Sequence, residues 1–379
     1  MTQEGALRVE PVDGPRDLEQ FIRLPWAVYA HDPSWVPPLL AERRQLLSQQ
    51  NPYCAHARWQ GWVARRRAKP VGRISAQIDR LYLEHHEADV GFFGMLDASE
   101  DPEAFAALLN AAETWLREQG MRRVHGPFNL SINQEAGLLI EGFHTPPMIG
   151  MAHNHRYYGH HIEAQGYVKA KDLLAYWLGL GYETPKTVRK MLDRLSRRIT
   201  HRSLRRGAFD EDVELVREIF NDAWSRNWGF VPFTREEFHE LGRSYKLLIT
   251  NDFVQIVELD GEPAAMMVSL PNLNEVIRDL DGRLLPHGWL KLLWRLKVRF
   301  PRTARVALMG VRRRYHGSPL GIALAFTAIE ASRKAAVKLG VREAELSWIL
   351  EDNQGMRSII ESLGGIAYKR YRVYEKALA

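Results

Sequence analysis

In the first half of the chain, apolar residues recur with the period of a strand in some segments and with the period of a helix in others. Strand-like runs over 59–66 and 71–79 predict a hairpin, and Val90-Gly91-Phe92-Phe93 predicts a further strand. Residues 101–120 then place apolar side chains at helical spacing up to Gly120, and a short strand follows at 123–125. Alternating strands and helices of this kind predict an α/β fold with a mixed sheet.

The second half repeats this plan. A strand near Ser203, helices over 210–227 and 234–248, and a hairpin over 253–270 precede a strand, a helix, a strand and a helix. Because this order is less generic than simple alternation, we predict two degenerate copies of one fold. The predicted parts are an N-terminal lobe at 1–182, a basic linker or helix at 183–202, and a C-terminal domain at 203–379. The basic segment fits either a solvated helix face or contact with phosphates.

Composition narrows the class of protein. The chain has 379 residues, 45% of them hydrophobic, and a formal charge of +6, so we expect a folded globule with an anionic partner. No run reaches the roughly 18 apolar residues of a membrane span, and acids and prolines occupy the first twenty positions instead of a signal core. These features predict a cytoplasmic protein. Cys54 is the single cysteine, which excludes an internal disulfide.

Histidines gather between 153 and 161, at positions 153, 155, 160 and 161. They lack the helical His-Glu-x-x-His pattern of a zinc site, so we predict no metal. Basic residues occur without a recognisable nucleic-acid-reading module, so we set nucleic acid aside as a partner.

The most informative segment joins a strand to a helix. Residues 305–311 form an apolar strand, 312–321 contain two glycines, and a helix continues to Leu339. A glycine-containing loop at a helix start binds anions, because unpaired backbone N–H groups and the positive helix end converge there. A pyrophosphate would suit this site.

This segment resembles the pyrophosphate loop of the GNAT acyltransferases, which reads Arg or Gln, two residues, Gly, one residue, then Gly or Ala. Here the three positions are His316, Pro319 and Gly321, and the first two depart from the pattern. Proline offers no N–H to a phosphate. A second family motif follows: the strand 343–349 and then Asn353, before a helix that ends at Gly364-Gly365. The two motifs occur in the family's order.

The resemblance implies a tandem GNAT-like fold whose N-terminal lobe lacks a glycine loop, with CoA or acyl-CoA as co-substrate and no metal. It implies the following cofactor-binding residues: Met309, Gly310, Val311, His316, Gly317, Ser318, Leu320, Gly321 and Asn353. Backbone N–H groups of residues 309–311 would stabilise the oxyanion of the tetrahedral intermediate. Many family members carry a tyrosine acid seven residues after the asparagine, where this chain has Ile360. Tyr368, Tyr371, Glu345 and His316 remain alternative acids.

A polar cluster stands out in the first half. In the stretch 126–137, polar Asn129, Ser131, Asn133 and Glu135 alternate with apolar residues and would share one face of an extended strand. The stretch resembles two-lobed, lipid-related GNAT proteins that include bacterial ceramide synthases. That resemblance implies Glu135 as the general base for an amine and the other three as substrate contacts. A hydrogen-bonded turn network fits the residues equally well.

Residues 286–302 predict an amphipathic basic helix. Trp289, Leu293, Leu296 and Phe300 line one face, and Lys291, Arg295, Arg299 and Arg302 line another. Such a helix packs on a core, skims an anionic membrane surface or walls an acyl-chain tunnel.

We therefore predict an N-acyltransferase that moves an acyl group from acyl-CoA, or from acyl carrier protein, to an amine. With the family resemblance, the predicted helix at 286–302 favours a long acyl chain, a sphingoid base or other amino-lipid as acceptor, and a peripheral place on the inner face of the membrane. The alternative is a GNAT-like protein that binds acyl-CoA or membrane without catalysis.

Overall fold

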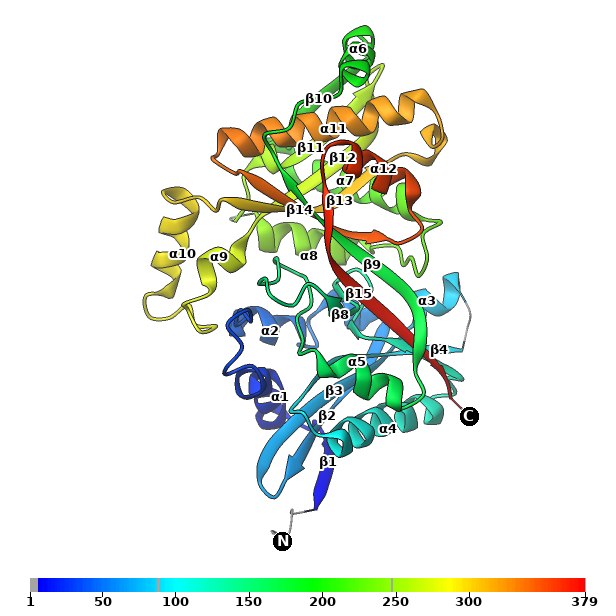
Figure 1. The fold of residues 1–379 in the computed structure, drawn as a ribbon, viewed down its shortest axis with the longest axis vertical. Helices are drawn as coiled ribbons and strands as arrows, with labels where there is room; N and C mark the ends of the chain where they lie inside the picture. The colour runs from blue at the N-terminus through cyan, green and yellow to red at the C-terminus, as the bar shows by residue number, and fades with distance from the viewer. Residues whose placement is uncertain (1–5, 87–88, 247, 379) are drawn as a thin grey trace. The chain divides into compact units, whose positions relative to one another are not determined.

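The computed structural model describes residues 6–86, 89–246 and 248–378, which form two compact units (Figure 1). Unit 1 comprises the described residues of 1–173, 277–284 and 369–379, and unit 2 comprises those of 174–276 and 285–368. Two strands, β9 (Val168–Gly179) and β15 (Ile366–Ala377), contribute residues to both units. The predicted boundaries at 182/183 and 202/203 stay predictions. The final strand, which we placed in the C-terminal domain, instead gives most of its residues to unit 1.

Unit 1 is built on a mixed sheet. Its elements are β1 (Leu7–Pro11), α1 (Pro15–Val28), α2 (Leu40–Leu46), η1 (Pro52–Ala55), β2 (Ala57–Arg66), β3 (Lys69–Asp79), α3 (Arg80–His85), β4 (Val90–Ala98), α4 (Pro102–Glu118), β5 (Arg123–Gly126), β6 (Phe128–Asn129), β7 (Glu135–Ala136), β8 (Leu138–Glu141) and α5 (Tyr157–Ala164). Strands β1 to β4 pair antiparallel in order, and β4 pairs with β5 in parallel. Residues 370–377 of β15 add antiparallel pairs with β8 and β5.

Helices cover both faces of the unit 1 sheet. Trp62 and Ala64 of β2 lie in the apolar cluster of α4, whereas Val63 between them lies in the cluster of α1 and α2. This division follows from the alternation of side chains along a strand. Helix α4 begins where Asp101 accepts hydrogen bonds from the N–H groups of Glu103 and Ala104, an N-cap with Pro102 in the first turn.

Unit 2 repeats the strand order of unit 1. Its elements are α6 (Lys186–Leu195), β10 (Ile199–Ser203), η2 (Arg206–Ala208), α7 (Phe209–Trp224), α8 (Arg235–Tyr245), η3 (Asn251–Phe253), β11 (Val254–Leu259), β12 (Glu262–Pro271), α9 (Leu273–Ile277, whose last residue belongs to unit 1), α10 (Gly288–Lys297), β13 (Thr303–Val311), η4 (Arg313–Tyr315), α11 (Pro319–Lys338), β14 (Glu343–Leu350) and α12 (Gln354–Ser362). Strands β10 to β13 pair antiparallel, and β13 pairs with β14 in parallel.

The same two-sided packing recurs in unit 2. Ala265 and Met267 of β12 lie in the cluster of α11, and Met266 lies in the cluster of α7. Each unit thus has a strand, two helices, an antiparallel hairpin, and a strand–helix–strand segment that ends in parallel pairing. This confirms the predicted mixed α/β architecture in two copies.

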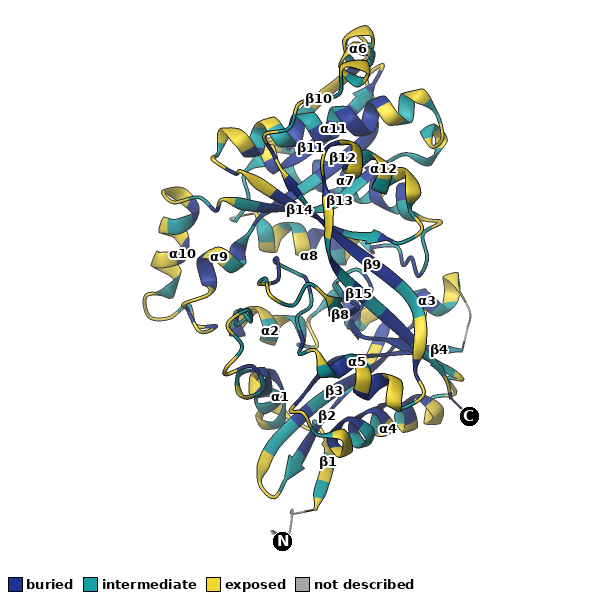
Figure 2. Ribbon diagram, in the orientation of Figure 1, coloured by how far each residue is buried: buried dark blue, intermediate teal, exposed yellow. Residues whose placement is uncertain are grey.

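Two segments outside this common plan carry charge. The basic stretch contains α6. Val188, Met191 and Leu192 of this helix pack against the α11 cluster, so the basic residues belong to a helix whose apolar side chains are packed on unit 2. Helix α10 buries only Leu292 and Leu296 and exposes much of its surface (Figure 2). Within the described ranges, no helix combines the length and apolar character that crossing a bilayer requires.

Candidate functional site

Strands β13 and β14 of unit 2 are paired by backbone hydrogen bonds at one end only. β13 pairs with β14 over Thr303–Val306 and Glu343–Leu346. On its other side, β13 pairs with β12 as far as Val311, and Gly310 there allows close packing, since a Cβ would lie 2.9 Å from that of Ala223. The backbone on the β14 side of residues 309–311 is therefore not used by the ladder with β14. This is where the sequence placed the oxyanion donors.

The loop after β13 is shaped by its own hydrogen bonds. The N–H of Tyr315 donates to the carbonyl of Arg312 at 3.0 Å, and the N–H of Arg313 donates to Asp222 Oδ2 at 2.8 Å. The exposed His316 turns back, with Nε2 2.7 Å from the carbonyl oxygen of Val311. The loop is therefore ordered, and His316 contacts the strand that precedes it.

Ser318 begins α11 as its N-cap. Its Oγ accepts from the N–H of Gly321 at 3.1 Å and donates to the carbonyl of Tyr315 at 2.7 Å. The N–H of Ser318 lies 3.3 Å from the same carbonyl oxygen. Among the described residues, no acceptor contacts the N–H groups of Gly317 and Leu320. These two donors of the predicted pyrophosphate loop are therefore available to bind an anion.

Glycine is required at position 321 by space. A Cβ there would lie 2.2 Å from the carbonyl oxygen of Tyr315, a backbone atom that cannot rotate away. Gly317 is required by conformation instead, because its φ is +70° with open space around it. The two glycines noticed in the sequence thus shape the loop for different reasons.

Further along unit 2, a buried carboxylate links β14 to β15. Glu345 Oε1 accepts from Ser347 Oγ at 2.5 Å, and its Oε2 accepts from the hydroxyl of Tyr368. Arg305 donates to Ser347 Oγ at 2.9 Å. Two of the alternative acids, Glu345 and Tyr368, therefore share one network, while Asn353 caps α12 by accepting from the N–H of Met356.

The polar stretch of unit 1 is a hairpin, not one extended strand. Asn129 of β6 pairs with Glu135 of β7, and residues 130–134 turn between them, with Ser131 Oγ accepting from the N–H of Asn133 at 3.1 Å. The local bond of Ser131 to the backbone favours a turn over an extended strand. The prediction of a single polar face over residues 129–135 is therefore wrong, and the turn network that we kept as an alternative is present.

Glu135 is held from both sides. Its Oε1 pairs with Arg43 of α2, and its Oε2 accepts from Asn129 Nδ2 at 2.7 Å. Asn129 Oδ1 in turn accepts from the N–H of Met95 at 2.7 Å, which fixes the amide. Burial is the largest single effect and opposes the charge of Glu135, but Arg43, the Asn129 amide and Arg73 together outweigh it and keep the pKa of the carboxyl below its usual value. A lowered pKa makes Glu135 a weaker base than the sequence suggested.

The second alternative tyrosine lies in a different setting. Tyr371 is fully buried in the unit 1 part of β15, opposite Leu139 of β8. Tyr368, three residues earlier, belongs to unit 2. Their different surroundings favour Tyr368 over Tyr371 as a residue that meets a substrate.

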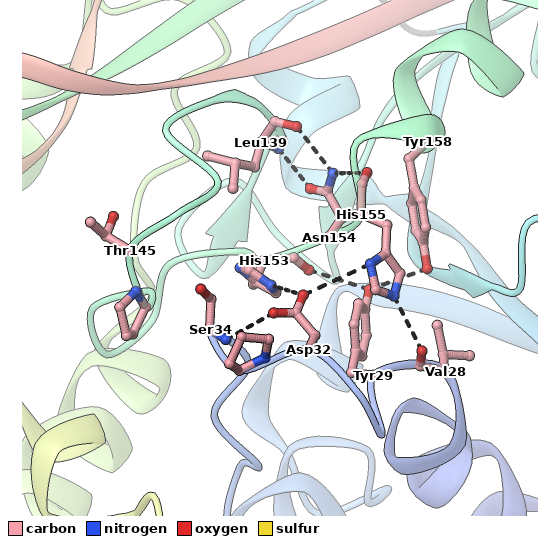
Figure 3. Close-up of polar contacts among 12 residues, drawn as sticks. Val28, Tyr29, Asp32, Ser34, Leu139, Thr145, His153, Asn154, His155 and Tyr158 are labelled. Carbon is pink, nitrogen blue, oxygen red and sulfur yellow. Dashed lines mark hydrogen bonds and ion pairs between the residues drawn. The ribbon is translucent and has the colours of Figure 1, made fainter.

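The sequence missed an aspartate–histidine pair in unit 1 (Figure 3). Nε2 of His153 lies 2.8 Å from Asp32 Oδ2, and Nδ1 of His155 lies 3.8 Å from the same oxygen. Asn154 between them fastens this loop to β8 by bonds of 2.8 and 3.0 Å to Leu139. Asp32 precedes His153 by more than a hundred residues, so no spacing rule links them. The one signal was the concentration of histidines after 153.

These histidines do not gather around a common metal position. His161 of α5 stacks on Phe105 of α4, with ring centroids 4.6 Å apart. His160 is exposed on α5. Across the described ranges, no three His, Cys, Asp or Glu side chains are grouped so that they could hold a metal ion.

Comparison with known proteins defines the class. Solved structures with the same fold include a tandem GNAT protein from the clavulanic acid biosynthesis pathway (TM-score 0.54, 15% identity, 99% of each chain covered). A GCN5-related N-acetyltransferase from Sphaerobacter thermophilus has a TM-score of 0.52 at 14% identity, covering 98% of this chain and 96% of that one. At these identities the likeness shows the fold, which is that of a duplicated GNAT acyltransferase.

Curated relatives give the family. The chain is 49% identical over 363 residues to protein YghO of Escherichia coli (strain K12), covering 96% of this chain and 93% of that protein. It is 47% identical over 375 residues to a bacterial ceramide synthase of Caulobacter vibrioides, covering 98% of both. None of the family models searched matches the chain. The protein belongs to the tandem GNAT acyltransferases, in the branch that contains these two relatives.

Proposed function

We propose that this acyltransferase moves a long-chain acyl group from acyl-CoA to the amine of an amino-lipid such as a sphingoid base. The observation that carries the proposal is the loop between β13 and α11, where two N–H donors and a helix start offer a site for a pyrophosphate. The near full-length similarity to a protein named ceramide synthase supports the amino-lipid acceptor. No step of this chemistry requires a metal.

The residues take roles that follow from their chemistry. Gly317 and Leu320 would donate to the pyrophosphate, while Ser318 and Gly321 keep the loop in shape. Main-chain N–H groups of residues 309–311 would bond the thioester oxygen as it becomes an oxyanion, where preorganised donors act most strongly. Tyr368 would protonate the departing thiolate, since it alone of the two tyrosines lies with Glu345 in unit 2.

The test is thiol release from palmitoyl-CoA and acetyl-CoA in the presence of sphinganine, a short alkylamine or no amine. We expect release that depends on the amine and is fastest with palmitoyl-CoA and sphinganine, with one N-acyl product per thiol by mass spectrometry. Palmitoyl-acyl carrier protein, offered in parallel, identifies the donor. Saturable palmitoyl-CoA binding without thiol release would instead establish the non-catalytic alternative.

The exposed residues of helix α10 support the proposal that the acceptor is a lipid in a membrane. Trp289 is 44% exposed and Trp294 52%, and Val298, directly after the helix, is 68% exposed, so large apolar groups meet solvent here. The prediction placed Trp289 and Phe300 on one face, but Phe300 lies beyond the helix and packs on Phe253, with ring centroids 5.7 Å apart. Exposed Lys297 and Arg299 stand beside the apolar residues. Exposed indoles beside cations suit the headgroup region of an anionic bilayer.

Replacing both indoles tests this surface. We expect Trp289→Ser/Trp294→Ser to weaken binding to phosphatidylglycerol-containing vesicles at least tenfold in a sedimentation assay. Two half-exposed indoles at about 25 cal/mol per Å² contribute more than the roughly 1.4 kcal/mol that corresponds to tenfold. Val337→Ser, at an apolar residue of α11 that is 47% exposed, is the matched control and should bind like the wild type. Equal sedimentation of all three proteins would contradict a membrane role for α10.

A further inference from the structure

The backbone N–H and carbonyl groups at the end of β13 point alternately to its two sides. Arg312 donates its N–H to the carbonyl of Ala264, next to β12, at 2.8 Å. In an antiparallel pair every second residue bonds to the same neighbour, so Gly310 also faces β12. Met309 and Val311 therefore face the side of β14, where the ladder between β13 and β14 has already ended.

Trp224, the last residue of α7, holds the first carbonyl on that side. Its Nε1–H donates to the carbonyl oxygen of Met309 at 2.8 Å. The indole packs against Phe220, with ring centroids 4.9 Å apart, and meets Trp348 of β14 edge-on, with ring centroids 5.4 Å apart. Aromatic packing within unit 2 therefore fixes the position of this donor.

The end of α7 also holds the loop that follows β13. Asp222 Oδ2 accepts from the N–H of Arg313 at 2.8 Å, and Nη1 of Arg313 donates to Ser225 Oγ at 3.0 Å. Between them, Ala223 packs so closely on β13 that only glycine fits at position 310. One helix end thus contacts both the strand with the predicted oxyanion donors and the predicted pyrophosphate loop.

His316 holds the second carbonyl on the same side of β13. Its Nε2 lies 2.7 Å from the carbonyl oxygen of Val311. Because a carbonyl oxygen only accepts hydrogen bonds, Nε2 carries a proton and donates it to this bond. His316 stands where the family motif has Arg or Gln, and both of those side chains are also donors. The departure from the motif therefore keeps a hydrogen-bond donor at this position.

The two bonds change what an oxyanion would meet at this side of β13. Its N–H groups attract a negative charge, whereas its carbonyl oxygens repel one. The carbonyls of Met309 and Val311 each accept a ring N–H, which offsets part of their negative potential. The same bonds hinder rotation of the backbone, so the neighbouring N–H groups keep their direction while charge develops on a substrate.

We infer that Trp224 and His316 are positioning residues of the oxyanion site, where they hold the carbonyls of Met309 and Val311 so that the N–H groups of these two residues stabilise the oxyanion. The inference rests on the proposed function and narrows its donors, since Gly310 faces β12. The amine nitrogen forms the C–N bond, and the carbonyl oxygen takes up an electron pair. When that pair returns, the C–S bond breaks, the nitrogen loses one proton and the thiolate gains one.

Trp224→Phe keeps an aromatic ring but removes the N–H donor. Removal of a whole oxyanion donor costs about 10²–10³ in kcat, so we expect loss of a positioning bond to lower kcat at least about tenfold. The KM for palmitoyl-CoA should stay within about twofold, because the oxyanion forms only during the reaction. Trp348→Phe is the matched control, since no acceptor among the described residues contacts the Trp348 N–H, and it should keep the wild-type kcat.

Two variants of His316 test the second bond. His316 is exposed, so both variants should fold as the wild type does. His316→Leu removes the donor and should lower kcat at least about tenfold. His316→Gln should recover most of the wild-type kcat, because its side-chain amide can donate to the same carbonyl. Equal kcat values for the leucine and glutamine variants would show that this bond does not position the oxyanion donors.

An infrared measurement on bound palmitoyl-CoA, labelled with ¹³C at its carbonyl, tests the inference without an acceptor amine. Hydrogen-bond donors weaken a carbonyl bond, so its stretching frequency should be lower on the wild type than in solution. This shift should shrink with Trp224→Phe and His316→Leu and persist with Trp348→Phe. Measurements of unfolding free energy on the same proteins separate a loss of positioning from a loss of folding.

The outcomes separate this inference from the proposed function. Equal carbonyl frequencies in all these proteins, or a Trp348→Phe enzyme as slow as Trp224→Phe, would overturn the inference. Amine-dependent thiol release by the wild type would then leave the proposed function standing. Absence of thiol release with every amine would remove the proposed function, and the carbonyl frequencies would still decide whether Trp224 and His316 set the direction of the donors.

Discussion

A Gly321→Val enzyme is expected to lose at least about a hundredfold in kcat/KM for palmitoyl-CoA. The new Cβ would start 2.2 Å from the carbonyl oxygen of Tyr315, so the loop must move. That movement displaces the N–H groups of Gly317 and Leu320 from an anion, and hydrogen bonds to charged groups contribute about 1.5–3 kcal/mol each. Losing two such bonds corresponds to a factor of a hundred or more. Calorimetric titration with CoA should show the same loss in affinity.

Gly207→Val is the control for this substitution. Gly207 lies in η2 of the same unit, where a Cβ would meet no atom within 4 Å and the backbone is not left-handed. Its variant should keep wild-type kcat/KM and CoA affinity. If Gly321→Val binds CoA as the wild type does while circular dichroism shows a native fold, the loop is not the pyrophosphate site and the proposed function loses its main support.

Arg43→Met is expected to lower the free energy of unfolding by about 3 kcal/mol at pH 7, because it leaves a buried carboxylate without its cation. Arg43 is 23% exposed and Glu135 18%, so solvent cannot replace the lost partner. The pKa of Glu135 is lowered in the folded protein, so the pair stabilises above the unfolded pKa of about 4.3 and is lost as pH falls through the folded value. The difference in unfolding free energy between wild type and variant should therefore shrink as the pH falls below the unfolded pKa of about 4.3. Urea unfolding at pH 7 and at about pH 3 measures both the difference and its loss.

Two further variants separate the pair from its surroundings. Arg43→Met/Glu135→Gln removes both charges and should recover part of the lost stability, since no unpaired ion remains. Arg44→Met breaks a neighbouring pair with Glu19 in which the two side chains are 49% and 35% exposed, and it should cost less than about 1 kcal/mol. If Arg43→Met and Arg44→Met lowered the free energy of unfolding equally, burial would not increase the contribution of the Arg43–Glu135 pair to stability.

The repeating elements could be predicted from the sequence because each carries its own periodic signal. The helix predicted over 101–120 is α4 (Pro102–Glu118), and the strand predicted over 305–311 lies within β13. The strand predicted from Val90 ended too early, at Phe93, whereas β4 continues to Ala98. There the register with β3 shifts between Arg73 and Ser75, and Met95 has a φ of +46°, so the simple alternation is interrupted.

The candidate site was less accessible to prediction. The loop around Gly321 carries a local motif, and the sequence located it. The contacts of Glu135 depend on Arg43, and those of His153 depend on Asp32, partners 92 and 121 residues away along the chain. No periodicity links residues at such distances. Only tertiary packing shows that one carboxylate is already paired while the other orients a histidine.

Strand β15 must be synthesised before the sheet of unit 1 can be completed. Arg370 to Ala377 supply pairs to β8 and β5, strands that emerge from the ribosome more than two hundred residues earlier. Chains fold as they are made, N-terminal segments first. Unit 1 must therefore wait, with part of its sheet unpaired, until residues 370–377 have been synthesised. A nascent chain that stops before residue 369 leaves both β8 and β5 with an uncovered edge, which is a template for association with other chains.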